Sequence, residues 1–72
     1  MIMKRYVVVI EKTPNGTFSA FVPDLPGCIT VGNTEEETRN YIKEAMELHL
    51  EGMKEDGDPI PEPTTTAMFI EV

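Results

Sequence analysis

FSAFVPDLPGCITVGNTEEE, residues Phe18 to Glu37, carries the strongest structural signals in this chain. Residues Phe18 to Val22 and Cys28 to Val31 have the composition of β-strands. Between them, Pro23 to Gly27 contains two prolines and a glycine and must turn the chain, and the prolines make that corner stiff. Thr34 to Glu37 then has the spacing of a helix capping box. This stretch therefore predicts two strands joined by a rigid corner and followed by a helix.

The segments on either side predict two further strands. Met3 to Glu11 is rich in β-branched residues, and Val7 to Ile10 is apolar at odd and even positions alike, which predicts a central strand covered on both faces. Thr13 to Gly16, TPNG, suits a type I turn with a bulge that closes an antiparallel hairpin with the strand Thr17 to Val22. Thr66 to Val72 is expected to form the last strand.

One helix is expected from Glu35 to about Glu55. The hydroxyl of Thr34 should accept a hydrogen bond from the amide of Glu37, whose carboxylate should reach back to the amide of Thr34. Gly57, followed by the prolines of residues 58–63, ends the helix and begins an extended tether. The side chains expected on its apolar stripe are Thr38, Tyr41, Ile42, Ala45, Met46, Leu48 and Met53.

The resulting fold class is α+β, a two-layer β-β-β-α-β arrangement resembling part of a ribonuclease H-like fold. A right-handed crossover would place the fourth strand beside the first, so the expected order in the four-stranded sheet is 3-2-1-4. One helix can cover only one face of such a sheet. Tyr6, Val8 and Ile10 alternate with Val7 and Val9, which makes both faces apolar. We therefore expect self-association, as a dimer or tetramer, through the uncovered face or an edge strand.

Length and composition indicate one soluble, cytoplasmic domain over residues 1–72. No apolar run approaches the roughly 20 residues that cross a membrane. Residues Tyr6 to Ile10 are too short for a signal peptide. A single cysteine, with no internal partner for a disulfide, agrees with a reducing compartment.

The net charge of −7 arises from 13 acidic and 6 basic residues and makes nucleic acid an improbable direct ligand. An acidic surface of this kind would attract a basic protein partner, although a solvated helix face that maintains solubility is the simpler explanation. Eight of the acids fall between positions 35 and 56: Glu35, Glu36, Glu37, Glu44, Glu47, Glu51, Glu55 and Asp56.

No catalytic, metal or cofactor site is predicted. Cys28 and His49 are better explained by packing than as a nucleophile and its base, since such a pair needs mutual contact and a third orienting group. The acids cluster on one helix, and no phosphate-binding motif occurs. Ribonuclease H-like chemistry needs carboxylates at strand centres, whereas Glu11 and Asp24 lie at a strand end and in a corner.

Taken together, these residues resemble the HicB-like antitoxin family. The specific elements are PDLPGC at residues 23–28, the helix entry G-x-T-x-x-E at residues 32–37 and the helix exit DGDPIP at residues 56–61. The resemblance implies a domain that binds and silences HicA-type toxins, which are small basic proteins that cleave messenger RNA. Longer members of the family carry a DNA-binding segment after this domain; because this chain stops at Val72, we expect it not to repress its own promoter.

Asp24 and Leu25 in the corner, which we expect to be exposed, and Glu35 and Glu36 at the helix start are the candidate contacts for such a toxin. Corner rigidity and helix capping are their alternative roles. An orphan oligomerising module without a toxin partner is the alternative function, and a magnesium-dependent nuclease is a third hypothesis.

Overall fold

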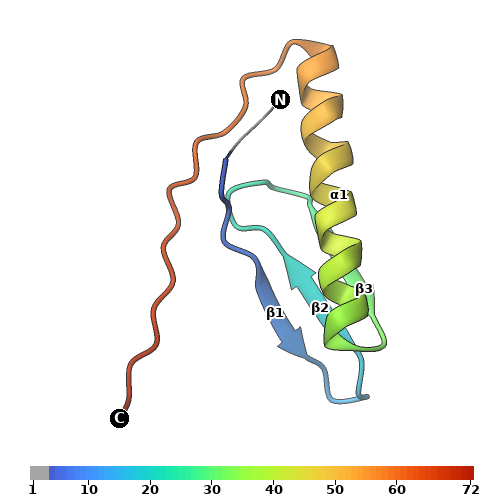
Figure 1. Cartoon of the computed structure of the whole chain (residues 1–72), viewed down its shortest axis with the longest axis vertical. Coiled ribbons are helices and arrows are strands. Elements are labelled where there is room, and N and C mark those ends of the chain that lie inside the picture. Colours follow the sequence, from blue (N-terminus) through green and yellow to red (C-terminus); the bar gives the residue numbers. More distant parts are fainter. Residues whose placement is uncertain (1–3) are drawn as a thin grey trace.

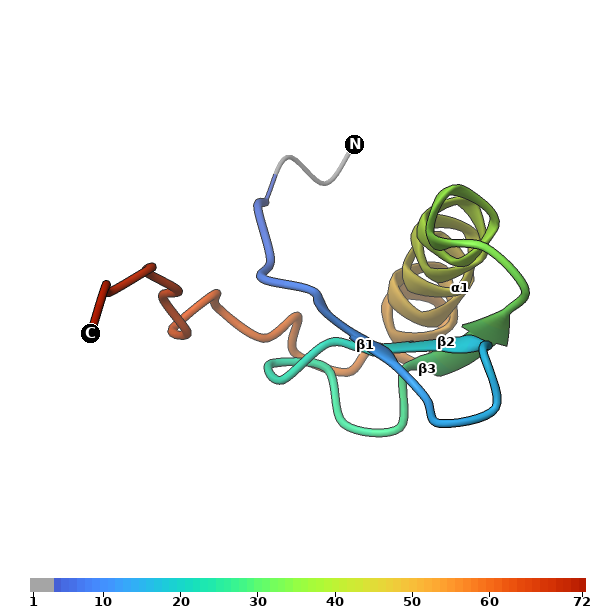
Figure 2. The same ribbon diagram turned by 90° about the horizontal axis from the view of Figure 1, so that it is seen from below.

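The computed structural model describes residues 4–72, in which three β-strands precede one helix. The strands β1 (Val9–Lys12), β2 (Phe18–Phe21) and β3 (Ile29–Gly32) form an antiparallel sheet in the order β1-β2-β3. The helix α1 (Glu35–Asp56) lies across one face of this sheet (Figures 1 and 2). The α+β class and the helix predicted from the capping box are confirmed.

The hairpin between β1 and β2 closes at the predicted turn. The amide of Thr13 donates to the carbonyl of Thr17 at 2.8 Å, and the amide of Gly16 donates to the carbonyl of Thr13 at 3.1 Å. Gly16 has φ +87°, a left-handed conformation that glycine adopts without steric cost. The turn residues therefore set the register in which Ile10 opposes Ala20.

The corner between β2 and β3 is closed by three backbone hydrogen bonds. Leu25 donates to the carbonyl of Val22 at 3.0 Å, Cys28 donates to that of Leu25 at 3.0 Å, and Val22 donates to that of Cys28 at 3.2 Å. Because the two prolines of the corner have no amide donors, these bonds come from the remaining residues. The corner is thus a small folded unit whose side chains have fixed directions.

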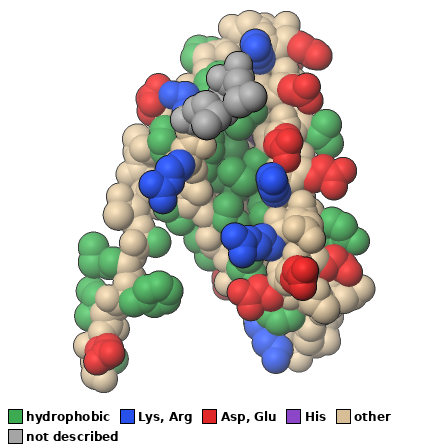
Figure 3. Space-filling view, viewed as in Figure 1, with side chains coloured by type: hydrophobic (Ala, Val, Ile, Leu, Met, Phe, Trp, Pro, Cys, Tyr) green, Lys and Arg blue, Asp and Glu red, His purple; other side chains and the backbone are tan. Residues whose placement is uncertain are grey.

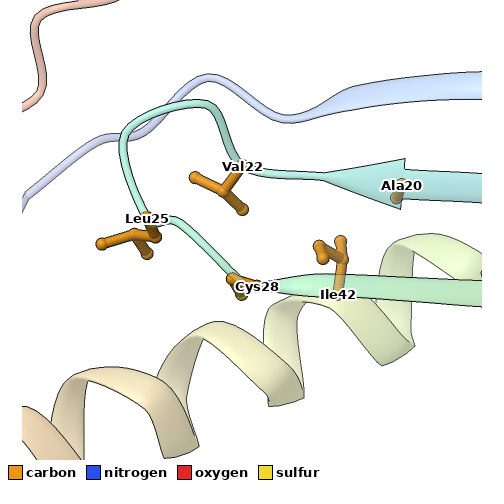
Figure 4. Close-up of a cluster of buried hydrophobic side chains, with 5 residues drawn as sticks. All are labelled: Ala20, Val22, Leu25, Cys28 and Ile42. Carbon is orange, nitrogen blue, oxygen red and sulfur yellow. The ribbon is translucent and has the colours of Figure 1, made fainter.

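The hydrophobic core lies between this corner, the sheet and α1. Five side chains form its buried centre, and Figure 4 shows them coming from β2, the corner and the helix. They are Ala20, Val22, Leu25, Cys28 and Ile42. Half-buried side chains from the first strand and the helix pack around them: Tyr6, Val8, Ile10, Ala45, Met46 and Leu50.

The predicted fourth strand and the strand order 3-2-1-4 are wrong, because the sheet of the described residues has three strands. Residues 66–72 are extended but pair with no strand, and they run away from the sheet toward the C-terminus (Figures 1 and 2). The physical reason is that Thr64 and Thr65, just before this segment, are hydrogen-bonded to the corner at Asp24. The chain is therefore drawn past the corner and not along β1.

The first strand is also shorter than predicted, and it lies at an edge. Pairing begins at Val9, opposite Phe21, because β2 ends there and the following chain turns into the corner. Residues 4–8 consequently have no ladder partner on that side. The predicted start of this strand, Met3, lies outside the described residues.

Two members of the predicted helix stripe do not face the sheet. Thr38 and Ile42 are buried as expected, whereas Tyr41 and Leu48 are 45% and 64% exposed. At about 100° per residue, positions 41 and 48 lie roughly a quarter turn or more from the line through Thr38 and Ile42. The apolar stripe is wider than the contact between the helix and the sheet. The side chains at the edge of the stripe are therefore exposed to solvent.

A close approach between β3 and α1 yields the first prediction. A Cβ atom at Gly32 would lie 2.5 Å from Thr38 Oγ1 and 3.0 Å from the backbone nitrogen of Thr38. Thr38 Oγ1 already donates to the carbonyl of Thr34 at 2.7 Å and cannot move without losing that bond. We expect Gly32→Ala to lower the free energy of unfolding by about 1–3 kcal/mol in urea denaturation, as overpacking generally does.

Gly52→Ala is the matched control. Nothing lies within 4 Å of a Cβ at Gly52, and alanine is preferred over glycine inside a helix by about 0.5–1 kcal/mol. This variant should be more stable than wild type. Equal effects of the two substitutions would show that the contact with Thr38 does not limit the packing of β3 on α1.

Candidate protein-interaction surface

The outer side of α1 is rich in exposed acidic side chains. Its carboxylates point away from the sheet and into solvent, as the red side chains along the helix in Figure 3 illustrate. Its exposed members are Glu36, Glu44, Glu47, Glu51 and Glu55. The exposed side chains of Tyr41 and Leu48, seven residues or about two turns apart, border this acidic surface. Such a mixture of charge and apolar area suits a basic partner that also brings apolar side chains.

Of the three glutamates in the first turn of α1, one caps the helix and the other two are exposed. The amide of Glu37 donates to Thr34 Oγ1 at 3.0 Å, and Glu37 Oε1 accepts from the amide of Asn33 at 3.1 Å. The carboxylate thus reaches one residue further back than the predicted amide of Thr34. Glu35 and Glu36 are exposed in the same turn, where negative charge is favoured by the helix dipole.

A hollow between β1 and α1 lies beside the helix start. Its apolar side is formed by Val8, Ile10, Ile42 and Met46. Three charged residues of α1 line it as well: Glu35, Arg39 and Lys43. In Figure 3, hydrophobic and basic side chains meet in this part of the surface. The hollow therefore combines an apolar side with two basic groups and one acidic group of α1.

The corner holds the C-terminal segment through the carboxylate of Asp24. This carboxylate accepts four hydrogen bonds, from the amides of Thr64 and Thr65 at 3.0 Å each and from their hydroxyls at 3.0 and 2.9 Å. The hydrogen bond from the Thr65 amide is the largest cause that lowers the pKa of Asp24 below its usual value. We call this set of contacts the Asp24 latch.

Two further contacts join the tether to the segment before β1. The Tyr6 hydroxyl donates to the carbonyl of Pro61 at 2.5 Å, and Lys4 Nζ lies 2.8 Å from Glu62 Oε1. The Lys4–Glu62 pair is largely exposed, so it contributes little to stability. The tether after α1 is thus fastened at Pro61 and again at Thr64 and Thr65. The next two residues, Thr66 and Ala67, still line a hollow with residues 5–7.

The four residues predicted as contacts do not form one site. Asp24 and Leu25 lie before β3 and Glu35 and Glu36 lie after it, so the two pairs are at opposite ends of that strand (Figure 1). Leu25 is fully buried, which corrects the expectation that it lies exposed. Its amide and carbonyl close the corner, and this geometry turns the side chain into the core. Asp24 is engaged in the latch.

Sequence reasoning missed Tyr41, Leu48 and the two latch threonines. Tyr41 and Leu48 were assigned to the core because their spacing fits a helical stripe. For Thr64 and Thr65, a signal was available: two adjacent threonines after a proline-rich tether offer four donors, and an unpaired aspartate in a stiff corner can accept them.

The side chains that could act as a nucleophile or a base are instead placed in packing contacts. Cys28 is 4% exposed, and burial raises the pKa of its thiol. His49 is half-buried on α1. Within residues 4–72, no group of three His, Cys, Asp or Glu side chains could hold a metal ion. The same residues include no helix with the length and apolarity to span a bilayer.

The uncovered face of the sheet is apolar, as the single helix layer predicted. Phe21, Ile29 and Val31 are 37%, 65% and 57% exposed on the side away from α1. Phe21 pairs with Ile29 across β2 and β3, which brings their side chains together. This open sheet face is the second surface on which another protein could pack.

Comparison with known proteins identifies relatives along almost the whole chain. Residues 6–71 match the family described as HicB-like antitoxin of bacterial toxin-antitoxin system. A UPF0150 protein of Archaeoglobus fulgidus is 43% identical over 56 residues, which cover 75% of this chain and 81% of the relative. Antitoxin HicB 1 of Photorhabdus laumondii is 34% identical over 59 residues, which cover 82% of this chain and 38% of the antitoxin.

Other relatives are also longer than the matched region. A 14.9 kDa protein of Haemophilus phage HP1 is 38% identical over 65 residues, covering 90% of this chain and 48% of that protein. Among solved structures, the N-terminal domain of the Burkholderia pseudomallei antitoxin HicB matches with a TM-score of 0.73 and 25% identity, over 82% of this chain and 69% of that domain. The chain therefore spans about half or less of these two longer relatives, the phage protein and the Photorhabdus antitoxin.

The Asp24 latch predicts a pH-dependent attachment of the C-terminal segment. Because the folded state lowers the pKa of Asp24, the latch is complete above the ordinary aspartate pKa of about 3.9 and weakens as the pH falls through the lower folded value. In Asp24→Asn, the amide group offers fewer acceptors. We expect hydrogen exchange at the Thr64 and Thr65 amides to be faster in this variant at neutral pH, relative to their intrinsic rates.

The difference in protection between wild type and Asp24→Asn should shrink as the pH falls below about 4. Asp58→Asn, at an exposed aspartate earlier in the same tether, is the matched control and should leave protection unchanged. Equal protection of the two amides in wild type and Asp24→Asn at neutral pH would contradict the latch.

Proposed function

This chain belongs to the HicB-like antitoxin family, and from that membership we propose that it is an antitoxin that binds and silences a small basic toxin of the HicA type. The mechanism proposed is occlusion: the antitoxin covers the surface with which the toxin holds messenger RNA. The family match over residues 6–71 is the observation that carries this proposal.

Charge supports the choice of a basic partner. The chain has a net charge of −7, and the acids of α1 are exposed along the outer side of the helix. Charge complementarity of this kind raises the association rate with a basic partner and disfavours acidic partners. Apolar contacts, in contrast, mainly slow the dissociation of a complex. Tyr41 and Leu48 offer apolar area next to the acids.

The exposed glutamates Glu35 and Glu36 are the contacts that we propose at the helix start. They are exposed in a turn where the helix dipole favours acidic side chains. Asp24 and Leu25 contribute indirectly, since Asp24 holds the tether and Leu25 holds the corner in the core. The proposed toxin surface is thus centred on α1 and not on the corner.

A role without catalysis agrees with the residues at the strand centres. Ala20 and Thr30, which oppose each other in β2 and β3, offer no carboxylate to hold metal ions as ribonuclease H-like enzymes require. We accordingly propose a cytoplasmic protein that acts by binding proteins and requires neither cofactor nor nucleic acid.

An orphan oligomerising module is the second candidate function, and the open sheet face favours it. Exposed Phe21, Ile29 and Val31 form an apolar area that a second protein molecule could cover. In this case the chain would assemble as a dimer or tetramer without a toxin. Self-association is compatible with the antitoxin role as well, because the open sheet face and the acidic side of α1 lie on opposite sides of the molecule.

Co-expression with a HicA-like protein from a neighbouring gene tests the proposal. Wild type should restore growth and co-purify with the toxin. Glu35→Arg together with Glu36→Arg should weaken toxin binding by at least about 10-fold, or roughly 1.4 kcal/mol, in a calorimetric titration.

Asp56→Arg together with Asp58→Arg is the control, with the same change in net charge at two exposed aspartates at the other end of α1. It should leave toxin affinity nearer to wild type. Equal losses in both double variants would show that net charge, and not the helix start, determines binding. Failure of wild type both to rescue growth and to co-purify would overturn the antitoxin role and favour the orphan module.

A further inference from the structure

The C-terminal tail, residues 66–72, is the most exposed apolar segment of the protein. Its sequence, TAMFIEV, has strand composition. Met68, Phe69 and Ile70 are 75%, 106% and 74% exposed, and Val72 is fully exposed. In Figures 1 and 2 the tail leaves the body of the molecule in an extended conformation. An extended, apolar segment with no strand beside it is a ready partner for the edge of a sheet.

The root of this tail is bonded to the corner between β2 and β3. The amides and hydroxyls of Thr64 and Thr65 are all bonded to Asp24 in the corner. The amides are therefore not available to pair with β1 of the same chain. The first residues of the tail, Thr66 and Ala67, line a hollow with residues 5–7, and the tail leaves the body of the molecule beyond them.

The outer edge of β1 is available to pair with such a strand. Strand β1 pairs with β2 on one side, and along its other side the sheet of the described residues has no further strand. The segment around it is rich in valine and isoleucine, and Val8 and Ile10 adjoin the hollow against Ile42 and Met46 of α1. A seven-residue strand spans about 23 Å, which matches the length of residues 6–12.

We propose that the tail of one chain adds as a fourth strand to the β1 edge of a second copy, and that the two copies exchange tails in a two-fold dimer. This inference rests on the self-association proposed above and names the segment that brings it about. With two-fold symmetry, each tail pairs with the β1 edge of the other chain. No tail or edge is then left unpaired, so the assembly is complete with two chains. Each sheet then has four strands, with the fourth supplied by the partner.

Strand alternation indicates how the tail would lie. Met68, Ile70 and Val72 share one side of an extended chain, and Phe69 and Glu71 share the other. The three-residue apolar side would face α1 and fill the hollow beside Val8. Glu71 would then remain on the open sheet face, at its rim.

Light scattering on the chain of 72 residues tests the proposal. Wild type should have twice the mass of one 8.1 kDa chain. Ile70→Pro removes an amide donor in the middle of the tail and should weaken dimerisation by at least about 10-fold, with helical circular dichroism unchanged. Ile70→Val keeps both the amide and the apolar side chain and should remain dimeric.

Each light-scattering result that departs from this expectation contradicts a different part of the proposal. A monomeric wild type at high concentration would overturn the tail exchange together with self-association. A dimer that persists unweakened in Ile70→Pro would overturn the tail exchange and leave association through the open sheet face. Neither result depends on the toxin, so a failure here is distinguishable from a failure of the antitoxin role.

Crosslinking distinguishes exchange from a tail that folds back on its own chain. Val9→Cys chains and Glu71→Cys chains are used, because Val9 pairs with Phe21 on the open sheet face, where the proposal also places residue 71. They are refolded together under reducing conditions and treated with a short bismaleimide after folding, when Cys28 is buried. Exchange predicts covalent pairs containing one chain of each type. In the double variant Val9→Cys/Glu71→Cys, crosslinks confined within single chains would overturn exchange.

Discussion

The corner at residues 23–27 is the constraint on which the rest of this structure depends. Three backbone hydrogen bonds and two prolines give it a fixed shape. That shape directs Leu25 into the core against α1, while the neighbouring Asp24 faces the other way and collects four hydrogen bonds from the tether. Adjacent residues thus connect the sheet to the helix and to the C-terminal segment. In a chain of 72 residues with a five-residue buried centre, few other contacts could do both.

A single helix over a sheet makes the two sides of the molecule chemically different. The side of α1 that faces solvent is acidic, and the sheet face opposite α1 carries Phe21, Ile29 and Val31. Two copies with a net charge of −7 each repel one another when their helices approach. Association through the sheet or the β1 edge keeps those helices apart and buries apolar area. The same arrangement leaves the acidic sides of both copies accessible to basic partners.

Local signals in the sequence predicted the elements whose stability is local. The TPNG turn, the two-proline corner, the capping box at Thr34 and the glycine that ends α1 all occur as expected, because each depends on a few neighbouring residues. The fourth strand was predicted from composition alone, and its pairing depended on where the chain was anchored 40 residues earlier, at Asp24. Leu25 was misplaced for a related reason: a corner between two prolines resembles an exposed loop until its hydrogen bonds are known. Tyr41 and Leu48 show that helical spacing identifies an apolar stripe without fixing how much of it the sheet covers.

The latch and the tail together explain why strand composition in residues 66–72 does not produce a strand within one chain. Asp24 holds the amides of Thr64 and Thr65, the two residues that lead into the tail, so these amides cannot begin a ladder along β1 in the same chain. The aspartate offers charged acceptors, which form stronger hydrogen bonds than a neutral ladder does, and its lowered pKa keeps it ionised. The latch therefore prevails at neutral pH, and the tail is presented outward at a fixed place on the surface. A strand held in this way loses less conformational freedom on binding than a fully flexible terminus would, which favours its capture by a second sheet edge.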